Sequence, residues 1–304
     1  MTLRHLRAGA AVAVALLALT ACGGGTDTAA TSAAADGKVA VVASTNVWGS
    51  VVKAVGGDAV TVHSIIDDPS ADPHSYESKP ADVAALGKAK LVVFNGGGYD
   101  DFFTKLIGDS GADAAKQVDA FALSGKADGV NEHVWYDLPT VKKVADKVAE
   151  ELSAAAPDQK DTFTANAKAF DDGLAGLTTS VQKVGTDHPG SKVVVTEPVP
   201  HYLLEAAGIT DATPAEFSEA IENETDVPVA ALTETTGLIT GKQVNALVNN
   251  TQTENSVTQQ LVSGAGTAGI PVVGVTETLP AGVSGYLDWM TKQVDALSTA
   301  LSQN

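Results

Sequence analysis

The sequence predicts an α/β protein made of two similar βαβ domains, whose mostly parallel sheets are joined by one long helix. Strand-like and helix-like stretches alternate in both halves of the 304-residue chain. Strands that are separated by helices favour parallel pairing. A long amphipathic stretch at residues 158–184 lies near the middle of the chain. The two halves share an order of elements but no sequence repeat.

The first half predicts an N-terminal α/β domain at residues 38–157. Apolar runs rich in valine predict strands, and amphipathic runs predict helices. The strands are expected at 38–43, 59–66 and 91–94, and the helices at 47–55, 80–86, 101–107 and 138–152. Gly56 and Gly57 would stop the first of these helices, and Pro139 suits the first turn of the last one.

Residues 158–184 predict a single helix of roughly 40 Å, at 1.5 Å per residue. Its apolar residues recur in alternating steps of four and three, which places them in one stripe along the helix. They are Phe163, Ala167, Phe170, Leu174, Leu177, Val181 and Val184. The stripe suits either an ordinary amphipathic helix or a strut between two domains. Its central position favours a linking helix at residues 158–186.

The second half repeats the alternation and predicts a C-terminal α/β domain at residues 187–304. Strands are expected at 192–196, 244–248 and 271–275, and helices at 202–207, 227–239, 255–265 and 286–301. Gly208 would end the first of these helices.

The amino-terminal segment predicts export and membrane anchoring. Arg4 and Arg7 precede an apolar run of about a dozen residues, which is too short to span a bilayer and is typical of a signal peptide at residues 1–21. The following Cys22 completes a sequence that resembles the bacterial lipobox, in which this cysteine is lipidated. The alternative is an unmodified thiol beside an ordinary cleavage site. Residues 22–37 are rich in Gly, Ala, Thr and Ser and predict a flexible tether.

Charge and cysteine content narrow the class of protein further. Cys22 is the single cysteine, so a disulfide within the chain is excluded. Removal of residues 1–21 takes away two arginines and no acidic residue, and the net charge moves from −18 to −20. Such an acidic chain is a poor partner for nucleic acid, since phosphate binding needs a basic surface. One acyl chain alone anchors a protein only marginally, and the lipobox resemblance implies a diacylglyceryl anchor that meets this need.

Two histidines lie on loops next to predicted strands and helices. His74 follows the strand at 59–66, and Pro69 and Pro73 stiffen the backbone around it by restricting φ. His133 lies just before the helix at 138–152. Each has an alternative interpretation: His74 as a solvated loop residue, and His133 as a residue held by neighbouring polar groups.

Two carboxylates occupy corresponding places in the second half. Glu197 follows the strand at 192–196, and Glu277 comes shortly after the strand at 271–275. Open α/β sheets bind ligands beyond the carboxyl ends of their strands, so these residues and the two histidines could meet in a cleft between the domains. The alternatives are a helix-dipole role for Glu197 and a solvated turn for Glu277.

The chemistry of these four residues suits a divalent cation. Two neutral imidazoles and two carboxylates carry a charge of about −2, which a divalent ion neutralises. Mixed nitrogen and oxygen donors suit manganese, iron or zinc, and the lack of thiolate argues against copper(I).

Five motifs together resemble a known family. They are D-P-H-S-Y-E at 72–77, N-E-H-V-W-Y-D at 131–137, V-T-E at 195–197, V-T-E-T-L at 275–279 and Y-L-D-W-M at 286–290. The chain resembles the zinc- and manganese-binding lipoproteins of ABC transporters, the cluster A-I (cluster 9) solute-binding proteins, over essentially its whole mature length.

The resemblance implies a monomeric, non-enzymatic binding protein without a catalytic cofactor, which captures Mn²⁺ or Zn²⁺ and delivers it to an ABC permease. It would be lipid-anchored on the outer face of the bacterial cytoplasmic membrane. The implied metal ligands are His74, His133, Glu197 and Glu277, and the implied closure on binding is limited.

The sequence departs from parts of the family in three places. Zinc-type members usually have a third histidine at the position of Glu197, whereas manganese-type members have a glutamate there. Glu277 stands where an aspartate is usual, and the histidine-rich loop of many zinc-type members is absent between Gly108 and Asn131. The first and third departures favour manganese. The preference is only slight, because zinc generally out-competes manganese at a given nitrogen and oxygen site.

Two other classes of function compete with transport. Two histidines and a glutamate also form a catalytic zinc triad with an open water position, as in hydrolases. However, the sequence contains no H-E-x-x-H motif, and a fourth protein ligand would occupy the position of the reactive water. A surface adhesin is the third class, and only the expected exposure of a lipoprotein favours it.

Overall fold

The structure is a computed structural model, and it describes residues 37–69, 71, 76–112 and 115–303. The described residues all belong to one compact unit. The predicted signal segment, Cys22, nearly all of the tether and His74 lie outside the described residues. Within the described part of the chain, no helix is both long and apolar enough to cross a membrane.

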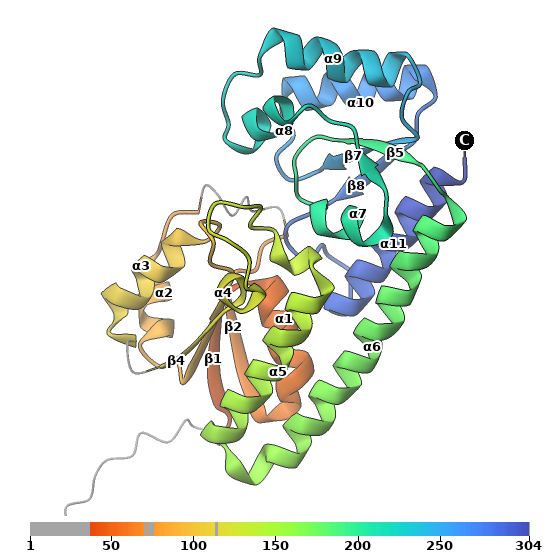
Figure 1. Cartoon of the computed structure of the whole chain (residues 1–304). Coiled ribbons are helices and arrows are strands. Elements are labelled where there is room, and N and C mark those ends of the chain that lie inside the picture. The colour runs from red at the N-terminus through yellow and green to blue at the C-terminus, as the bar shows by residue number, and fades with distance from the viewer. Residues whose placement is uncertain (1–36, 70, 72–75, 113–114, 304) are drawn as a thin grey trace, which may run out of the picture. The chain divides into compact units, whose positions relative to one another are not determined.

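The first half contains a four-stranded parallel sheet in the order β2-β1-β3-β4 (Figure 1). Its strands are β1 (Val39–Thr45), β2 (Val60–Ile66), β3 (Leu91–Phe94) and β4 (Lys116–Asp119), and its helices are α1 (Asn46–Gly56), α2 (Pro80–Leu86), α3 (Asp101–Ser110), α4 (Ala120–Ser124) and α5 (Leu138–Ala155). Short 3₁₀ helices occur at Gly57–Ala59, Val134–Tyr136 and Pro157–Gln159. The alternation of strands and helices was predicted, and so was the parallel pairing.

The second half contains a second four-stranded parallel sheet, in the order β6-β5-β7-β8. Its strands are β5 (Lys192–Val195), β6 (Thr210–Asp211), β7 (Ala246–Asn250) and β8 (Val272–Val275). Its helices are α7 (His201–Ala207), α8 (Ala215–Glu222), α9 (Val229–Thr240), α10 (Ser256–Ala268) and α11 (Tyr286–Leu301). Both sheets therefore have the same strand order, which confirms the prediction of two similar parallel-sheet domains.

The long helix α6 (Lys160–Asp187) packs against both halves of the protein. It contacts α1 and α5 of the first half and α7 and α11 of the second, and Figure 1 shows it running beside both sheets. All seven apolar residues of the predicted stripe are buried. The stripe therefore joins the two halves into one core, as expected of a strut. The domain boundaries given above stay a prediction.

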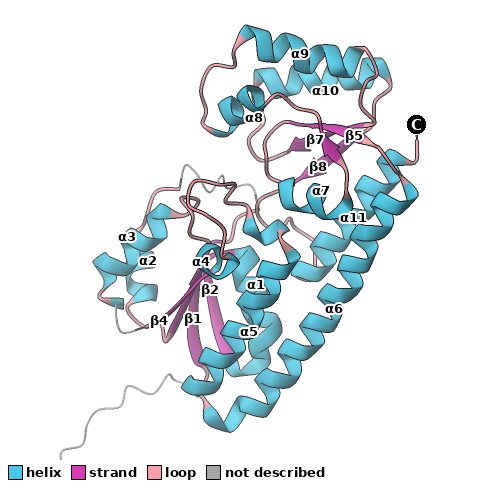
Figure 2. Ribbon diagram, viewed as in Figure 1, coloured by secondary structure: helices cyan, strands magenta, loops and turns pink. Residues whose placement is uncertain are grey.

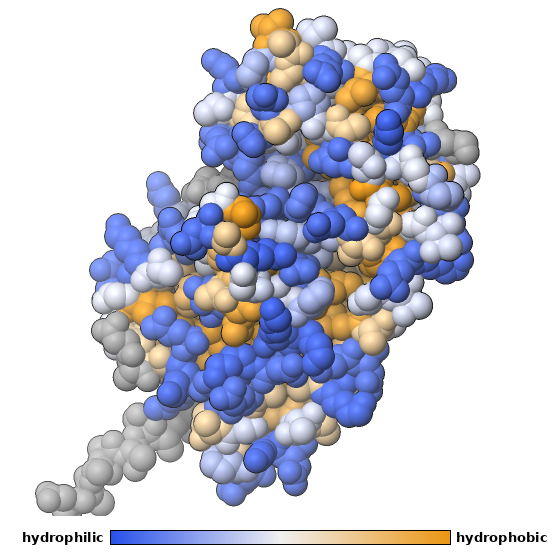
Figure 3. Space-filling model, viewed as in Figure 1, coloured by the Kyte–Doolittle hydropathy of each residue, from blue (hydrophilic) through white to orange (hydrophobic). Residues whose placement is uncertain are grey.

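The central strands β1, β3, β5 and β7 are largely buried between layers of helices, as strands of parallel sheets usually are. Side chains that alternate along β1 separate into two clusters: Val41 packs toward α1, α5 and α6, whereas Val42 packs toward α2 and α3. Val193 and Val194 of β5 divide in the same way between the shared core and the α8, α9 and α10 layer. Figure 2 shows helices on both faces of the sheets, and Figure 3 shows a surface on which hydrophilic residues predominate.

Four short elements were not predicted, namely β4, α4, β6 and α8. In β4 only Val118 is buried, so the strand has no apolar pattern to reveal it. The strand β6 has two residues and the helix α4 has five, which is below the length at which periodicity can be measured. The helix α8 has eight residues, and its helical period rests on Phe217, Ala220 and Ile221.

Candidate metal-binding site

Loops from the carboxyl ends of both sheets meet and are joined by hydrogen bonds. The side-chain Nδ2 of Asn131 donates to the backbone carbonyl of Pro198, with 2.7 Å between the atoms. Tyr202 on α7 donates from its hydroxyl to the carbonyl of Asn131 at 2.5 Å. The loop that contains His133 therefore contacts the loop that contains Glu197.

The two predicted carboxylates converge on one amide. Nδ2 of Asn250, the last residue of β7, donates both to Glu197 and, at 2.8 Å, to Oε1 of Glu277. Thr253 donates from its hydroxyl to the other oxygen of Glu197 at 2.5 Å. Glu197 is 3% exposed and Glu277 is 1% exposed. Two carboxylates at this burial would repel each other if both were ionised, and a cation placed between them would relieve that repulsion.

His133 is fully buried and is oriented by Asn131. Oδ1 of Asn131 accepts from the backbone N–H of His133 at 2.9 Å and lies 3.1 Å from ring atom Nδ1. Asn131 uses its Nδ2 to bind Pro198, so its oxygen is the atom that faces the ring. Because an amide oxygen only accepts, the hydrogen bond assigns the proton to Nδ1. In the neutral imidazole the lone pair then lies on Nε2, as suits a metal ligand.

Two further carboxylates lie next to the imidazole of His133. Oε1 of Glu222, the last residue of α8, is 3.4 Å from Nε2 of His133. Among the residues that the structure describes, the one triad whose donor atoms all lie within 4.8 Å of one another is Glu132, His133 and Glu222. Glu197 and Glu277 are joined through the amide of Asn250 and are not part of this triad.

His74 lies outside the described residues, but the segment just before it is tied to the site. Nε2 of Gln252 donates to the carbonyls of Pro69 and Ala71, at 3.0 and 3.2 Å. Oε1 of the same side chain accepts from the backbone N–H of Glu277. Gln252 therefore connects the end of the loop that precedes residues 72–75 to one of the predicted ligands.

Three supporting residues and Glu222 were not singled out from the sequence. Asn131 belongs to the motif at 131–137, but no role was assigned to it. Asn250 ends a buried strand in a pair of adjacent asparagines, and this unusual pair is a signal that could have identified it. Gln252 offers no such signal. Glu222 would have required α8, whose Phe217 and Ile221 are spaced four apart as on one helix face.

A buried aspartate supports the His133 loop from the first sheet. Both oxygens of Asp100 accept from backbone N–H groups, of Asn95 at 2.7 Å and of Gly96 at 2.8 Å. Nδ2 of Asn95 donates to the carbonyl of Glu132 at 2.8 Å. Burial raises the pKa of Asp100 to about 6, although the two N–H donors act in the opposite direction.

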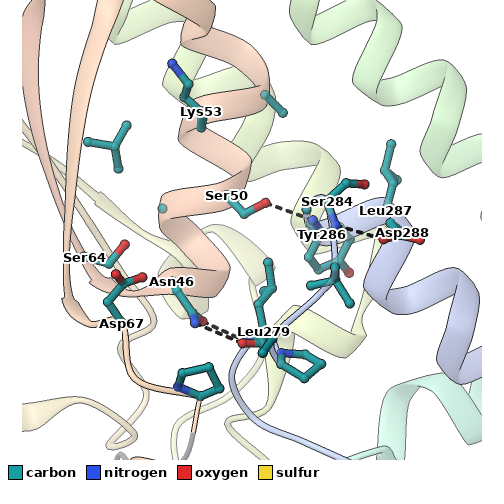
Figure 4. Close-up of a pocket in the computed structure, with 18 of the residues that line it drawn as sticks. Asn46, Ser50, Lys53, Ser64, Asp67, Leu279, Ser284, Tyr286, Leu287 and Asp288 are labelled. Atoms are coloured by element: carbon teal, nitrogen blue, oxygen red, sulfur yellow. Dashed lines mark hydrogen bonds between the residues drawn. The ribbon is translucent and has the colours of Figure 1, made fainter.

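Two cavities lie close to these loops. A cavity of about 430 Å³ is lined by both Glu197 and Glu222. A larger one, of about 890 Å³, lies between α1, β2 and the segment that follows Glu277 (Figure 4). Figure 4 shows Asn46 of α1 paired with the backbone of Leu279, at 3.2 and 2.9 Å. This pairing fixes the segment after Glu277 to the first half.

Comparison with known proteins identifies the family. Residues 41–300 match the family model described as ZnuA, zinc-uptake complex component A, periplasmic. The manganese-binding lipoprotein MntA of Halalkalibacterium halodurans is 26% identical over 95% of this chain and 97% of its own length. The manganese ABC transporter substrate-binding lipoprotein PsaA of Streptococcus pneumoniae is 30% identical over 70% of this chain and 72% of its own.

The fold has counterparts among solved structures. The periplasmic zinc-binding protein TroA of Treponema pallidum superposes with a TM-score of 0.74 at 20% identity, over 87% of this chain and 99% of that one. The family model covers most of the chain. This chain therefore belongs to the ZnuA family, the periplasmic component A of zinc-uptake complexes.

Proposed function

We propose that this protein captures a divalent transition-metal ion, manganese or zinc, outside the cytoplasmic membrane and delivers it to the permease of an ABC transporter. The observation that carries the proposal is the convergence of the buried carboxylates of Glu197 and Glu277 on Asn250. This pair lies in the same loop cluster as the buried imidazole of His133. Buried carboxylates of this kind are stabilised by a bound cation.

The proposed ligands are His74, His133, Glu197 and Glu277, two from each half of the chain. The ion would enter as cargo and would be bound by imidazole nitrogen and carboxylate oxygen, the donors that manganese and zinc accept. Because α6 packs against helices of both halves, large hinge motions would disrupt a continuous core. This supports capture with limited closure.

Several features of the relatives support the wider proposal. MntA and PsaA are named as manganese-binding or manganese-transport lipoproteins, and TroA as a zinc-binding protein. These names support a permease partner, a lipid anchor at Cys22 and an extracytoplasmic location on the membrane. The family match favours transport over the hydrolase and adhesin alternatives. Glu197, in place of a histidine, favours manganese slightly.

The proposed organisation of the chain follows from the same argument. A signal peptide at 1–21 and a lipidated tether at 22–37 would precede the N-terminal domain at 38–157. The linking helix at 158–186 would then lead to the C-terminal domain at 187–304. We propose that the protein acts as a monomer and needs no catalytic cofactor.

Competitive metal titration of the chain from residue 23 onward tests the function. Manganese and zinc would be titrated by calorimetry, with elemental analysis of the protein as purified. We expect one-to-one binding, and manganese binding that withstands moderate zinc would identify a manganese importer. Zinc binding alone would identify zinc as the cargo. If neither metal binds, the proposed function is wrong.

A pair of glutamate variants tests the site. Glu197→Ala should weaken binding by at least about 100-fold, since a ligand contributes more than the outer groups that alone change affinity by 10- to 100-fold. Glu205→Ala is the matched control, because Glu205 is exposed on α7 in the same half. Wild-type affinity in Glu197→Ala would remove Glu197 from the site.

A further inference from the structure

We infer that Glu222 is an additional ligand of the same metal ion, bound next to His133, and that it biases the site toward manganese. The inference rests on the proposed function and extends its ligand set by one carboxylate from α8. It was not evident from the sequence, because residues 133 and 222 come from different halves of the chain.

The separation of the two side chains matches that of two ligands of one ion. Oε1 of Glu222 lies 3.4 Å from Nε2 of His133. Two donors at about 2.1 Å from a common ion are about 3.4 Å apart at a tetrahedral angle and about 3 Å apart at a right angle. The observed distance therefore leaves room for an ion between the two atoms. The carboxylate of Glu132 adds negative charge to the same triad.

The tautomer of His133 also supports a metal ion shared by His133 and Glu222. Asn131 assigns the ring proton to Nδ1, so the lone pair of the neutral ring lies on Nε2. Nε2 is also the ring atom that lies 3.4 Å from Oε1 of Glu222. An imidazole lone pair and a carboxylate oxygen are both donors to a metal ion, so the two atoms suit a divalent ion bound between them.

Glu222 occupies a place on its helix that disfavours a carboxylate. Glu222 is the last residue of α8, where the helix dipole is negative and disfavours a carboxylate. Its side chain is only 12% exposed. Phe217 and Ile221 of the same helix are buried in the core, so the backbone of Glu222 is held firmly in place. A residue that stands against such a local structural preference is typically a functional residue.

Glu222 also connects His133 to the predicted carboxylate pair. The cavity of about 430 Å³ is lined by both Glu222 and Glu197. Glu222 and Glu197 therefore face a common cavity. A third ionised carboxylate makes the ligand set more negative by one charge, and oxygen donors suit manganese better than they suit zinc.

Metal titration of two variants tests the inference. Manganese and zinc would be titrated into the wild-type chain from residue 23, Glu222→Gln and Glu224→Gln. Glu224 lines the same cavity, lies two residues away and is exposed, so its variant makes the same charge change without removing a ligand. We expect Glu222→Gln to lose manganese affinity by at least about 100-fold, and zinc affinity by less, while Glu224→Gln stays within about threefold of wild type.

The outcomes separate this inference from the proposed function. If the wild type binds metal and Glu222→Gln binds manganese as tightly, Glu222 is not a ligand and the proposed function stands. If the two glutamine variants lose affinity equally, the effect is general charge and the inference is wrong. If the wild type binds neither metal, both proposals fail.

A direct structural measurement covers the case in which Glu222→Gln does not fold. A crystal structure of the wild-type protein loaded with manganese would show a carboxylate oxygen of Glu222 within about 2.4 Å of the ion if the inference holds. A distance above about 3 Å would overturn it.

Discussion

The hydroxyl of Tyr136 donates a hydrogen bond to the backbone carbonyl of Thr276 across 2.9 Å. Tyr136 lies three residues after His133, and Thr276 directly precedes Glu277, so this bond joins the loops of two predicted ligands from opposite halves. Nε2 of Gln293 on α11 donates to the same hydroxyl at 2.6 Å. Burial raises the pKa of Tyr136, which keeps the phenol neutral and able to donate.

Removal of this hydroxyl should destabilise the protein and loosen the site. Tyr136→Phe keeps the ring but leaves the carbonyl of Thr276 and the amide of Gln293 without their partner, which costs about 1–3 kcal/mol in the free energy of unfolding. Urea denaturation of the metal-free protein measures this change. A variant that unfolds at the wild-type urea concentration would show that the bond contributes nothing to stability.

Asn250, which donates to both carboxylates, should contribute to stability mainly when metal is absent. Asn250→Leu deprives Glu197 and Glu277 of one amide, and we expect a loss of about 3 kcal/mol in the metal-free protein. Because a bound ion stabilises only the folded state, saturating metal should recover part of this loss. Thermal unfolding with and without metal measures both quantities.

The neighbouring asparagine provides a control for this variant. Asn249 is also buried, but its Nδ2 donates to Glu254 at 2.8 Å. Asn249→Leu should therefore lose stability to the same extent with and without metal. Equal recovery by metal in both variants would contradict the role assigned to Asn250.

The orientation of His133 depends on Asn131, and this dependence predicts a loss of affinity without a loss of fold. Asn131→Ala removes the acceptor of Nδ1 and the bond to Pro198. Groups that orient a metal-binding histidine typically change affinity by about 10- to 100-fold. The exposed Asn223, which bonds only within its own helix end, provides the control variant Asn223→Ala. Calorimetry should show a loss of metal affinity in Asn131→Ala and none in Asn223→Ala. Equal affinities in the two variants would contradict the role of Asn131.

The buried Asp100 predicts a fall in stability between about pH 4 and pH 6. Its pKa in the folded protein is about 6, against an ordinary value of 3.8. In this window the folded state holds the proton more tightly than the unfolded state, so the free energy of unfolding decreases as the pH rises through the folded pKa. The contribution is complete below about pH 4, and its loss amounts to about 3 kcal/mol at most.

Substitution of this residue should remove the pH dependence that it causes. Asp100→Asn should flatten the profile of stability against pH in this window. Asp101→Asn, at an exposed neighbouring residue, should leave the profile unchanged. The measurement is the midpoint of urea unfolding at half-unit pH steps, and parallel profiles for wild type and Asp100→Asn would contradict the assignment to Asp100.

Local patterns in the sequence predicted much of the fold and part of the candidate site. The stripe from Phe163 to Val184 predicted the linking helix, because helical periodicity is a property of neighbouring residues. The residues at strand ends predicted where Glu197 and Glu277 lie, because parallel strands place their carboxyl ends at one edge of a sheet. Short elements with few apolar residues, such as β4, gave no comparable signal.

The amino-acid sequence by itself determined the two α/β halves, the long helix between them and the residue types suited to a divalent ion. Only the tertiary structure decided that Asn250 binds both carboxylates, that Asn131 orients His133 and that Glu222 lies 3.4 Å from that histidine. The physical reason is that periodicity and turn chemistry act over a few residues. Contacts between residues 133 and 222 depend instead on how two sheets pack around a shared helix.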